Sequence, residues 1–351
     1  MLGLSVDWDG ETQTVLLNDP AVSEGAKILG KERVGCDWAE IDWSTAGDGY
    51  ARVTINELPD GPSAYGLCRT RWDDDGKWRY GGSYSLTEGE WDIPLYGGSA
   101  GSSVSVSLSF KACEHYLTEE EKIADEEWTS LLSVQFDAEI ADPDGVWLLS
   151  PPNVDFGHAP ETRAKALDLT RDCGTDAEKI TAVFYWVAQT IQYDHEMAGR
   201  LMAEEEQSLG SVSCQFDEVN GRHRLPPSSD EFGYIDQSSL SLDTILTRES
   251  GVCAHYAAIM AGMLRSVGVP CKVVTGSART SDGNLGHAWV AVNPGTGSLD
   301  MAALGAGQDF TDSRSGGASR PSGWIRLDPT NGLREPEYTS DDGNYLVREH
   351  H

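Results

Sequence analysis

The chain has 351 residues, with 26 Lys and Arg against 57 Asp and Glu, so its formal net charge is −31. Nucleic acids and anionic membrane surfaces are poor partners for such a chain, because phosphate groups bind basic surfaces. Hydrophobic residues make up 39% of the sequence, which suffices for a core and places the acidity on the surface of a folded protein. Because no run of about 18 apolar residues occurs, we expect no transmembrane segment, and the N-terminus predicts no signal peptide.

Residues 1–150 are predicted to form a β-rich, sandwich-like N-terminal domain. Short segments rich in β-branched and aromatic residues are separated by clusters of turn-forming residues, such as DDDG at 73–76. The acidic clusters lack the full spacing of a calcium loop with its closing Glu, so we expect turns and no metal site there. The expected strands are 12–17, 50–55, 78–86 and 103–110.

Residues 151–351 are predicted to form a second, α+β domain, because the hydrophobic period changes near residue 160. Apolar residues recur at helical spacing after Thr175, and Thr175 with Glu178 forms a capping-box pattern, which predicts a core helix. A polar stretch up to residue 240 is expected to form a surface excursion. The border between the domains is expected in the segment 142–157, which contains Pro and Gly.

The segment 249–276 (ESGVCAHYAAIMAGMLRSVGVPCKVVTG) predicts a helix that starts at Cys253, has one apolar face and ends at Gly268. A cysteine at a helix N-terminus lies near free N–H groups and the positive end of the helix dipole, which stabilise a thiolate. Cys253 is therefore a candidate nucleophile, with an inert capping thiol as the alternative. We expect His255 at the rim of the site and Cys271 as a small buried residue at the start of a strand.

Two further polar residues are expected at the edges of strands. His287 is predicted to begin the strand HAWVAVN, in which it shares a face with Trp289. Asp328 is predicted to end the strand WIRLDPT, and Pro329 favours an extended conformation there. Cys, His and Asp in such positions suit a nucleophile, a general base and a carboxylate that orients the base.

These motifs resemble the transglutaminase-like superfamily, specifically its bacterial cysteine peptidases and acyltransferases with an N-terminal β-domain. The segments that carry the resemblance are GVCAHYAAIMAGMLRSVGVPCKVVTG, GHAWVAV and WIRLDPTN, within residues 160–335. The resemblance implies a papain-like α+β core, with helices packed on an antiparallel sheet, and a catalytic triad of Cys253, His287 and Asp328. The calcium dependence of some members is not carried over to this chain, and no cofactor is expected.

The reaction that follows is acyl transfer from peptide or protein amides through a thioester. Hydrolysis of the thioester makes the chain a peptidase or amidase, which is the interpretation we favour, whereas transfer to a primary amine makes it a crosslinking transglutaminase. A noncatalytic adhesion module that retains the fold and a structural disulfide at Cys253 are the alternatives from other classes. An extracellular or cell-surface location is expected.

The oxyanion hole is expected to combine the backbone N–H of Cys253 with a side chain from upstream. Tyr234 is the candidate for this side chain, with Gln192, Tyr193 and Gln237 as alternatives.

Two long loop regions, 195–235 and 294–323, flank the motifs in the sequence. Such loops select substrates or gate a cleft in many enzymes, and surface decoration is the alternative.

Overall fold

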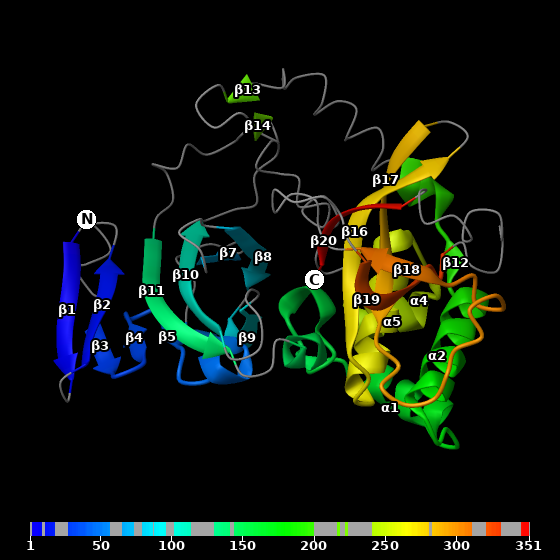
Figure 1. Cartoon of the computed structure of the whole chain (residues 1–351), viewed down its shortest axis with the longest axis horizontal. Coiled ribbons are helices and arrows are strands. Elements are labelled where there is room, and N and C mark those ends of the chain that lie inside the picture. The colour runs from blue at the N-terminus through cyan, green and yellow to red at the C-terminus, as the bar shows by residue number, and fades with distance from the viewer. Residues whose placement is uncertain are drawn as a thin grey trace. The chain divides into compact units, whose positions relative to one another are not determined.

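The chain divides into two compact units in the computed structural model, Met1–Pro152 and Asn153–His351 (Figure 1). No helix within the described part of the chain is long and apolar enough to cross a membrane. The structure describes residues 2–8, 11–17, 27–56, 65–73, 79–86, 88–95, 102–113, 130–140, 144–199, 216–217, 222–223, 241–280, 283–310, 321–330 and 345–350.

In its described residues, the first unit consists of antiparallel strands and two short 3-10 helices. Its elements are β1 (Leu2–Trp8), β2 (Glu11–Leu17), β3 (Lys27–Gly30), β4 (Arg33–Gly35), β5 (Ala39–Asp42), η1 (Ala46–Asp48), β6 (Tyr50–Ile55), β7 (Tyr65–Asp73), β8 (Arg79–Leu86), β9 (Gly89–Pro94), β10 (Ser102–Cys113), β11 (Ser130–Ile140) and η4 (Gly145–Leu148). The two larger sheets have the strand orders β3-β4-β5-β6-β9 and β11-β10-β7-β8, and β1 pairs with β2.

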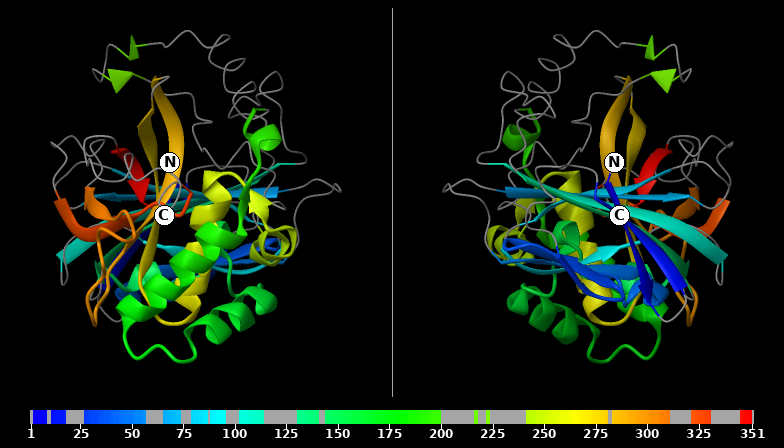
Figure 2. Two further views of the ribbon diagram at one scale, coloured as in Figure 1. Left: turned by 90° about the vertical axis from the view of Figure 1, so that its right-hand side faces the viewer. Right: turned by 90° about the vertical axis from the view of Figure 1, so that its left-hand side faces the viewer.

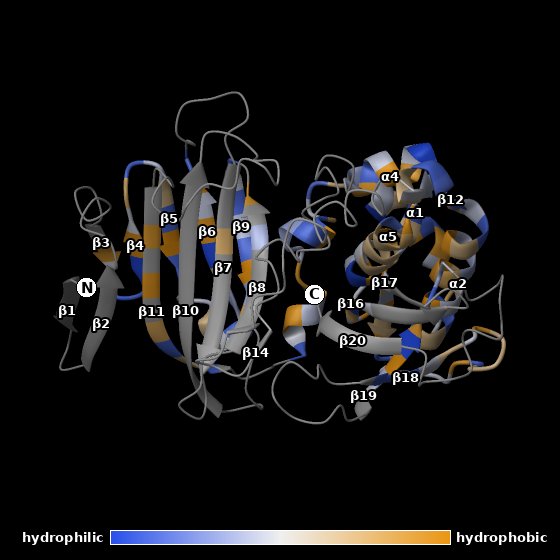
Figure 3. Ribbon diagram, turned by 90° about the horizontal axis from the view of Figure 1, so that it is seen from above, coloured by the Kyte–Doolittle hydropathy of each residue, from blue (hydrophilic) through white to orange (hydrophobic). Residues whose placement is uncertain are grey.

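The two larger sheets of this unit share one buried core. Alternate residues of β5 and β6 are buried, which is the period of a strand with one face against a core. The orange and blue bands along β5 and β6 show this alternation (Figure 3). Val53 from one sheet and Val134 from the other belong to the same buried cluster, in which Trp43 stacks on Phe136. The predicted strand 50–55 coincides with β6.

The second unit combines helices with an antiparallel sheet. Its elements are η5 (Pro152–Val154), α1 (Pro160–Thr170), α2 (Asp176–Thr190), β12 (Gln192–Tyr193), β13 (Phe216–Asp217), β14 (Arg222–His223), α4 (Leu242–Arg248), β15 (Ser250–Gly251), α5 (Cys253–Ser266), β16 (Cys271–Thr280), β17 (Gly283–Val292), β18 (Gly307–Phe310), β19 (Pro321–Leu327) and β20 (Tyr345–His350). Five strands form one sheet in the order β18-β19-β17-β16-β20, and β16 and β17 form its long central hairpin (Figure 2). The predicted mixture of helices and antiparallel sheet is confirmed.

Helix α5 is buried on all sides, whereas the sequence pattern predicted a single apolar face. Every residue from Ala254 to Arg265 is buried, since α1, α2, α4, β16 and β17 all contact this helix. Gly262 permits the close approach of α4, because a Cβ at this position would lie 2.2 Å from Cδ1 of Leu242. The helix ends before Gly268, as predicted, with φ +81° at this glycine. Such all-round burial fixes the position of Cys253 at the N-terminus of the helix.

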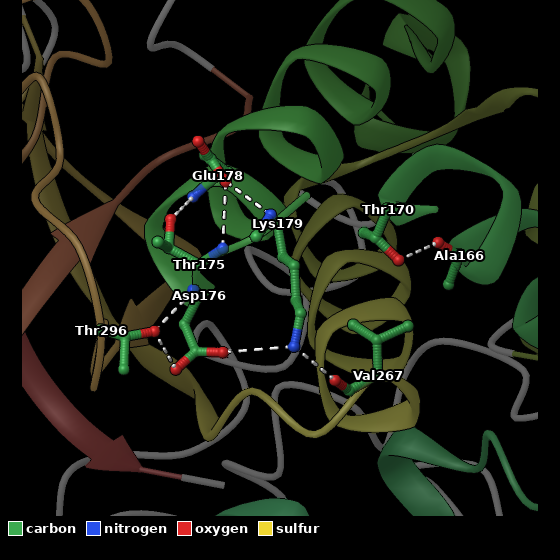
Figure 4. Close-up of polar contacts among 9 residues, drawn as sticks. Ala166, Thr170, Thr175, Asp176, Glu178, Lys179, Val267 and Thr296 are labelled. Carbon is green, nitrogen blue, oxygen red and sulfur yellow. Dashed lines mark hydrogen bonds and ion pairs between the residues drawn. The ribbon is translucent and has the colours of Figure 1, made fainter. Parts of the chain in front are cut away.

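The first turn of α2 contains the predicted capping box. The N–H of Glu178 donates to Oγ1 of Thr175 over 3.3 Å, and the N–H of Thr175 donates to the Glu178 carboxylate over 3.0 Å (Figure 4). Lys179 donates both to Asp176 and to the carbonyl of Val267, at the end of α5. The helix therefore begins at a well-defined residue and is tied to its neighbour.

The loop that follows β17 is anchored on the same turn. The N–H of Asp176 donates to Oγ1 of Thr296, and the N–H of Ala177 donates to the Thr296 carbonyl. Gly297 adopts φ +84°, and a Cβ there would lie 2.9 Å from Ala177 Cβ. Part of the predicted loop region 294–323 thus packs on α2, and residues 307–310 add strand β18 to the sheet. Residues 311–320 and most of 195–235 lie outside the described residues.

Candidate active site

A short parallel pair of strands leads the chain into α5. Gln192 and Tyr193 of β12 pair with Ser250 and Gly251 of β15. Before this pair, Glu249 ends α4 in the left-handed region, with φ 51°. The N–H of Gln192 donates to the Glu249 carbonyl over 2.8 Å. These bonds fix the loop from which Cys253 projects.

Cys253 is the first residue of α5 and is half-buried. Its thiol is free in the structure, so a structural disulfide at Cys253 finds no support. The first N–H groups of a helix have no partner inside the helix. Within the described part of the chain, the N–H groups of Cys253 and Ala254 have no hydrogen-bond partner. Both donors therefore remain available next to the thiol.

His287 and Asp328 are brought together by the pairing of β17 with β19. Val290 lies opposite Leu327, so Asp328 falls next to His287 on the same face of the sheet. The distance from Nε2 of His287 to Oδ2 of Asp328 is 2.7 Å, and their exposed fractions are 9% and 1%. His287 lies within β17, which begins at Gly283, so the prediction that it begins a strand was wrong.

The carboxylate of Asp328 is held in a defined orientation. While Oδ2 faces His287, Oδ1 accepts the N–H of Thr330 over 3.0 Å, in a turn that contains Pro329. The ring of Trp289 lies 5.9 Å from the His287 ring, between ring centroids, and packs beside it. Nε2 faces the carboxylate, which leaves Nδ1 as the ring nitrogen for Cys253.

The electrostatic environment of His287 favours its charged form. Burial lowers the pKa of this histidine, but the charge and hydrogen bond of Asp328, together with the interaction with the Cys253 thiol, raise the pKa well above 6.5. His287 thus interacts with both Cys253 and Asp328, an order of contacts that suits a nucleophile, base and orienting carboxylate.

Tyr193 is the upstream side chain that the structure brings to this group. Burial, followed by the charges of Cys253, Tyr256 and Asp328, raises the pKa of its phenol to about 12. Its ring lies 6.5 Å from the Tyr256 ring, between centroids. By contrast, the neighbouring Gln192 is exposed. Tyr234 and Gln237, the other residues considered for the oxyanion hole, lie outside the described residues.

His255 lies inside the protein, so the prediction of a rim position was wrong. Its exposed fraction is 0%, and its Nδ1 accepts the N–H of Val252 over 3.1 Å. The prediction failed because it assumed a single buried helix face, whereas α5 is enclosed on all sides. Cys271 is buried, as predicted.

The residues described by the structure contain no group of three or more His, Cys, Asp or Glu side chains arranged to hold a metal ion. The open depression between α1 and α4 is lined by Glu161, Asp243, Thr244, Thr247 and Arg248. Asp243 there accepts the N–H groups of Glu161 and Thr162, so it serves to cap α1.

Comparisons with known proteins find a family model that matches part of the second unit. The model of the transglutaminase-like superfamily matches residues 196–329, which include Cys253, His287 and Asp328. No curated protein matches the chain.

Solved structures with detectable similarity include the "Putative Cysteine Protease from Cytophaga hutchinsonii", at 9% identity and a TM-score of 0.34, covering 82% of this chain and 81% of that chain. A second is a "TGase", at 16% identity and a TM-score of 0.26, covering 52% of this chain and 32% of that chain. A third is a "putative protease from Parabacteroides distasonis", at 13% identity and a TM-score of 0.27, covering 85% of this chain and 68% of that chain. The chain is therefore similar to the transglutaminase-like superfamily within residues 196–329.

Proposed function

We propose that the chain is a cysteine-dependent acyl-transfer enzyme that acts on peptide or protein amides, with water as the acceptor. The observation that carries the proposal is the connection of the Cys253 thiol to His287 and of His287 to Asp328, at 2.7 Å for the latter pair. A noncatalytic adhesion module has no use for a buried, carboxylate-oriented imidazole beside a helix-terminal thiol. The family match supports chemistry of this class.

The reaction begins with attack of the Cys253 thiolate on the amide carbonyl. A C–S bond forms, and the carbonyl oxygen gains negative charge. The His287 imidazolium then donates its proton to the leaving amine as the C–N bond breaks, which leaves a thioester. Neutral His287 next accepts a proton from water as the water oxygen attacks the thioester. Breakdown of this second adduct releases the carboxylic acid and restores the thiolate and imidazolium.

Asp328 acts through His287 in both halves of the cycle. Its carboxylate fixes the ring so that Nε2 faces away from the thiol, and its charge stabilises the imidazolium. Because Thr330 holds the second carboxylate oxygen, the orientation of Asp328 does not depend on the substrate.

The oxyanion of each tetrahedral adduct requires donors that are already in place. The N–H of Cys253 is one donor, and Tyr193 is the described side chain best placed to be the second. The raised pKa of Tyr193, about 12, keeps its phenol protonated and able to donate. Replacing Tyr193 by Phe is expected to lower kcat by about 10²–10³-fold, the usual cost of one lost donor.

The first test is alkylation of the native protein by iodoacetamide, with mass mapping of the modified cysteines. We expect Cys253 to react much faster than Cys173, a second free and partly exposed thiol of the same unit. Replacement of His287 by Ala should slow the labelling of Cys253 and leave that of Cys173 unchanged. Equal rates at the two cysteines in the wild-type protein would reject the catalytic role of Cys253.

The second test separates the two acceptors. A library of peptide amides is incubated with the enzyme, with and without an added primary amine, and the products are identified by mass. Hydrolysed peptides in both samples are expected. Products that contain the amine in place of hydrolysis would show that the enzyme is a transglutaminase.

A further inference from the structure

The imidazole of His255 supports the peptide segment directly before Cys253. Its Nδ1 accepts the N–H of Val252, and its Cβ, Cγ and Nδ1 lie close to Gly251. A Cβ at Gly251 would lie 2.6 Å from Cβ and 2.7 Å from Cγ of His255. Only glycine at position 251 therefore permits this contact. The His255 ring packs on Gly251 and binds the N–H of Val252.

This contact, together with two backbone hydrogen bonds, fixes the orientation of Val252. The carbonyl of Val252 accepts the N–H groups of His255 and Tyr256, and its own N–H is bound by the His255 ring. Both ends of the Val252 residue are therefore fixed. The peptide that joins Val252 to Cys253 has little freedom to rotate, so the N–H of Cys253 has a fixed direction.

The imidazole is able to accept this bond because it is neutral. Burial is the main cause that lowers the pKa of His255, to about 4; the charge of Arg248 lowers it further, and the charge of Asp194 opposes the shift. The Val252 N–H occupies Nδ1, so the single ring proton of the neutral form lies on Nε2.

We propose that His255 is a positioning residue of the active site, which aligns the backbone N–H of Cys253 for the oxyanion by holding the Val252 peptide. The inference rests on the proposed function, since it assigns His255 a part in acyl transfer. His255 does not touch the reacting atoms, and it contributes only when negative charge develops on the substrate oxygen. Its loss should therefore lower kcat and leave KM unchanged.

The experiment compares His255→Leu, which removes the acceptor, with His255→Asn, whose Oδ1 can take the place of Nδ1. His158→Leu serves as the matched control, since His158 is exposed and distant in the sequence from the motifs. Each protein is assayed for peptide hydrolysis and for alkylation of Cys253 by iodoacetamide. Alkylation displaces iodide and forms no oxyanion, so it reports the thiolate without the oxyanion hole.

We expect His255→Leu to lose about tenfold or more in kcat, since a misaligned donor forfeits part of the 10²–10³-fold effect of an oxyanion contact. Its KM and alkylation rate should remain within about twofold of wild type, and His255→Asn should recover most of kcat. Equal kcat values for the Leu and Asn variants, or a parallel loss of kcat and alkylation, would overturn the inference.

Hydrogen exchange at the Val252 amide distinguishes this failure from failure of the proposed function. Slow exchange in the wild type and in His255→Asn, with fast exchange in His255→Leu, is the expected pattern. A wild-type Cys253 that alkylates no faster than Cys173 would reject the proposed function. Unchanged exchange in His255→Leu would reject the role of His255 alone.

Discussion

Helices α2 and α5 begin in contrasting ways, although a side chain in the first turn of each accepts the N–H of the preceding residue. In α2 the acceptor is the exposed, charged Glu178, and the Thr175 hydroxyl satisfies a further N–H. In α5 the acceptor is the buried, neutral His255, and Val252 provides no capping side chain. Thr175, Glu178 and Thr296 bind N–H groups at the start of α2. At the start of α5, the N–H groups of Cys253 and Ala254 have no partner within the described residues.

Under the proposed function, this difference separates a helix start that stabilises the fold from one that binds the oxyanion. A capping Ser, Thr or Asp before Cys253 would bind the N–H groups that an oxyanion needs. Val252 has no side-chain acceptor for these N–H groups, and His255 binds the N–H of Val252 instead. The N-terminus of α5, where the proposed oxyanion binds, therefore lacks the stabilisation of a conventional cap.

The largest effect is expected from Asp328→Asn, which removes the negative charge next to His287 and preserves the size of the side chain. We expect kcat to fall by about 10³–10⁴-fold, as for the equivalent carboxylate of other triads. The Asp328 charge raises the pKa of His287, so this pKa should be lower in the variant. The loss of activity on the alkaline side of the pH profile should therefore begin at a lower pH than in the wild type. A pH profile of kcat/KM measures the shift, and an unchanged profile would contradict the role of Asp328.

The next effect concerns the dependence of stability on pH. The pKa shifts of the two buried histidines, His255 and His287, have opposite signs. His255 has a pKa of about 4 when folded and 6.5 ordinarily, so its contribution is present above pH 6.5 and lost as pH falls towards 4. His287, with a raised pKa, stabilises fully below pH 6.5 and loses this contribution as pH rises through its folded pKa.

Urea unfolding between pH 4 and pH 6.5 tests the first of these contributions. The free energy of unfolding of His255→Asn should vary less with pH than that of wild type, by up to about 1.4 kcal/mol per pH unit, the value for one proton. The control variant His158→Asn should follow the wild type. Identical slopes for wild type and His255→Asn would contradict a buried neutral imidazole.

A smaller effect is expected from Gly251→Ala, because the added methyl group would overlap with His255. We expect a loss of about 1–3 kcal/mol in the free energy of unfolding, which is typical of overpacking. Gly199→Ala is the control, since a Cβ there meets nothing within 4 Å. Equal stabilities of the two variants would show that His255 does not pack on Gly251.

The smallest effect is expected at the start of α2. Thr175→Ala should lower the free energy of unfolding by about 1 kcal/mol, the usual cost of a lost N-cap, with no change in kcat. Thr181→Ala, within the same helix, removes a hydroxyl that bonds the Ala177 carbonyl and should be nearly neutral. A loss of activity in Thr175→Ala would break the distinction between the two helix starts.

Local patterns predicted much of this fold. The capping box of Thr175 and Glu178, the start of α5 at Cys253 and the stop at Gly268 all depend on neighbouring residues, and the structure confirms them. The α+β composition likewise follows from hydrophobic periods.

Features set by distant residues escaped prediction. His255 was misplaced because the burial of α5 depends on helices and strands from several parts of the chain. Tyr193 was only one of three alternatives to Tyr234, because its proximity to Cys253 follows from the pairing of two-residue strands, which leaves no hydrophobic pattern to detect. His255 lies three residues after Val252, the position from which a side chain can accept the N–H of the residue before the helix, and the sequence did contain this spacing.

The anchoring of the loop at Thr296 on α2 has a consequence for the order of folding. The capping box joins residues three apart and can form as soon as α2 does, whereas the bonds between Thr296 and Asp176 close a separation of 120 residues. Contacts of such separation pay a large loop-closure entropy and are expected late. Thr175→Ala should therefore slow refolding, and Thr296→Ala should mainly accelerate unfolding.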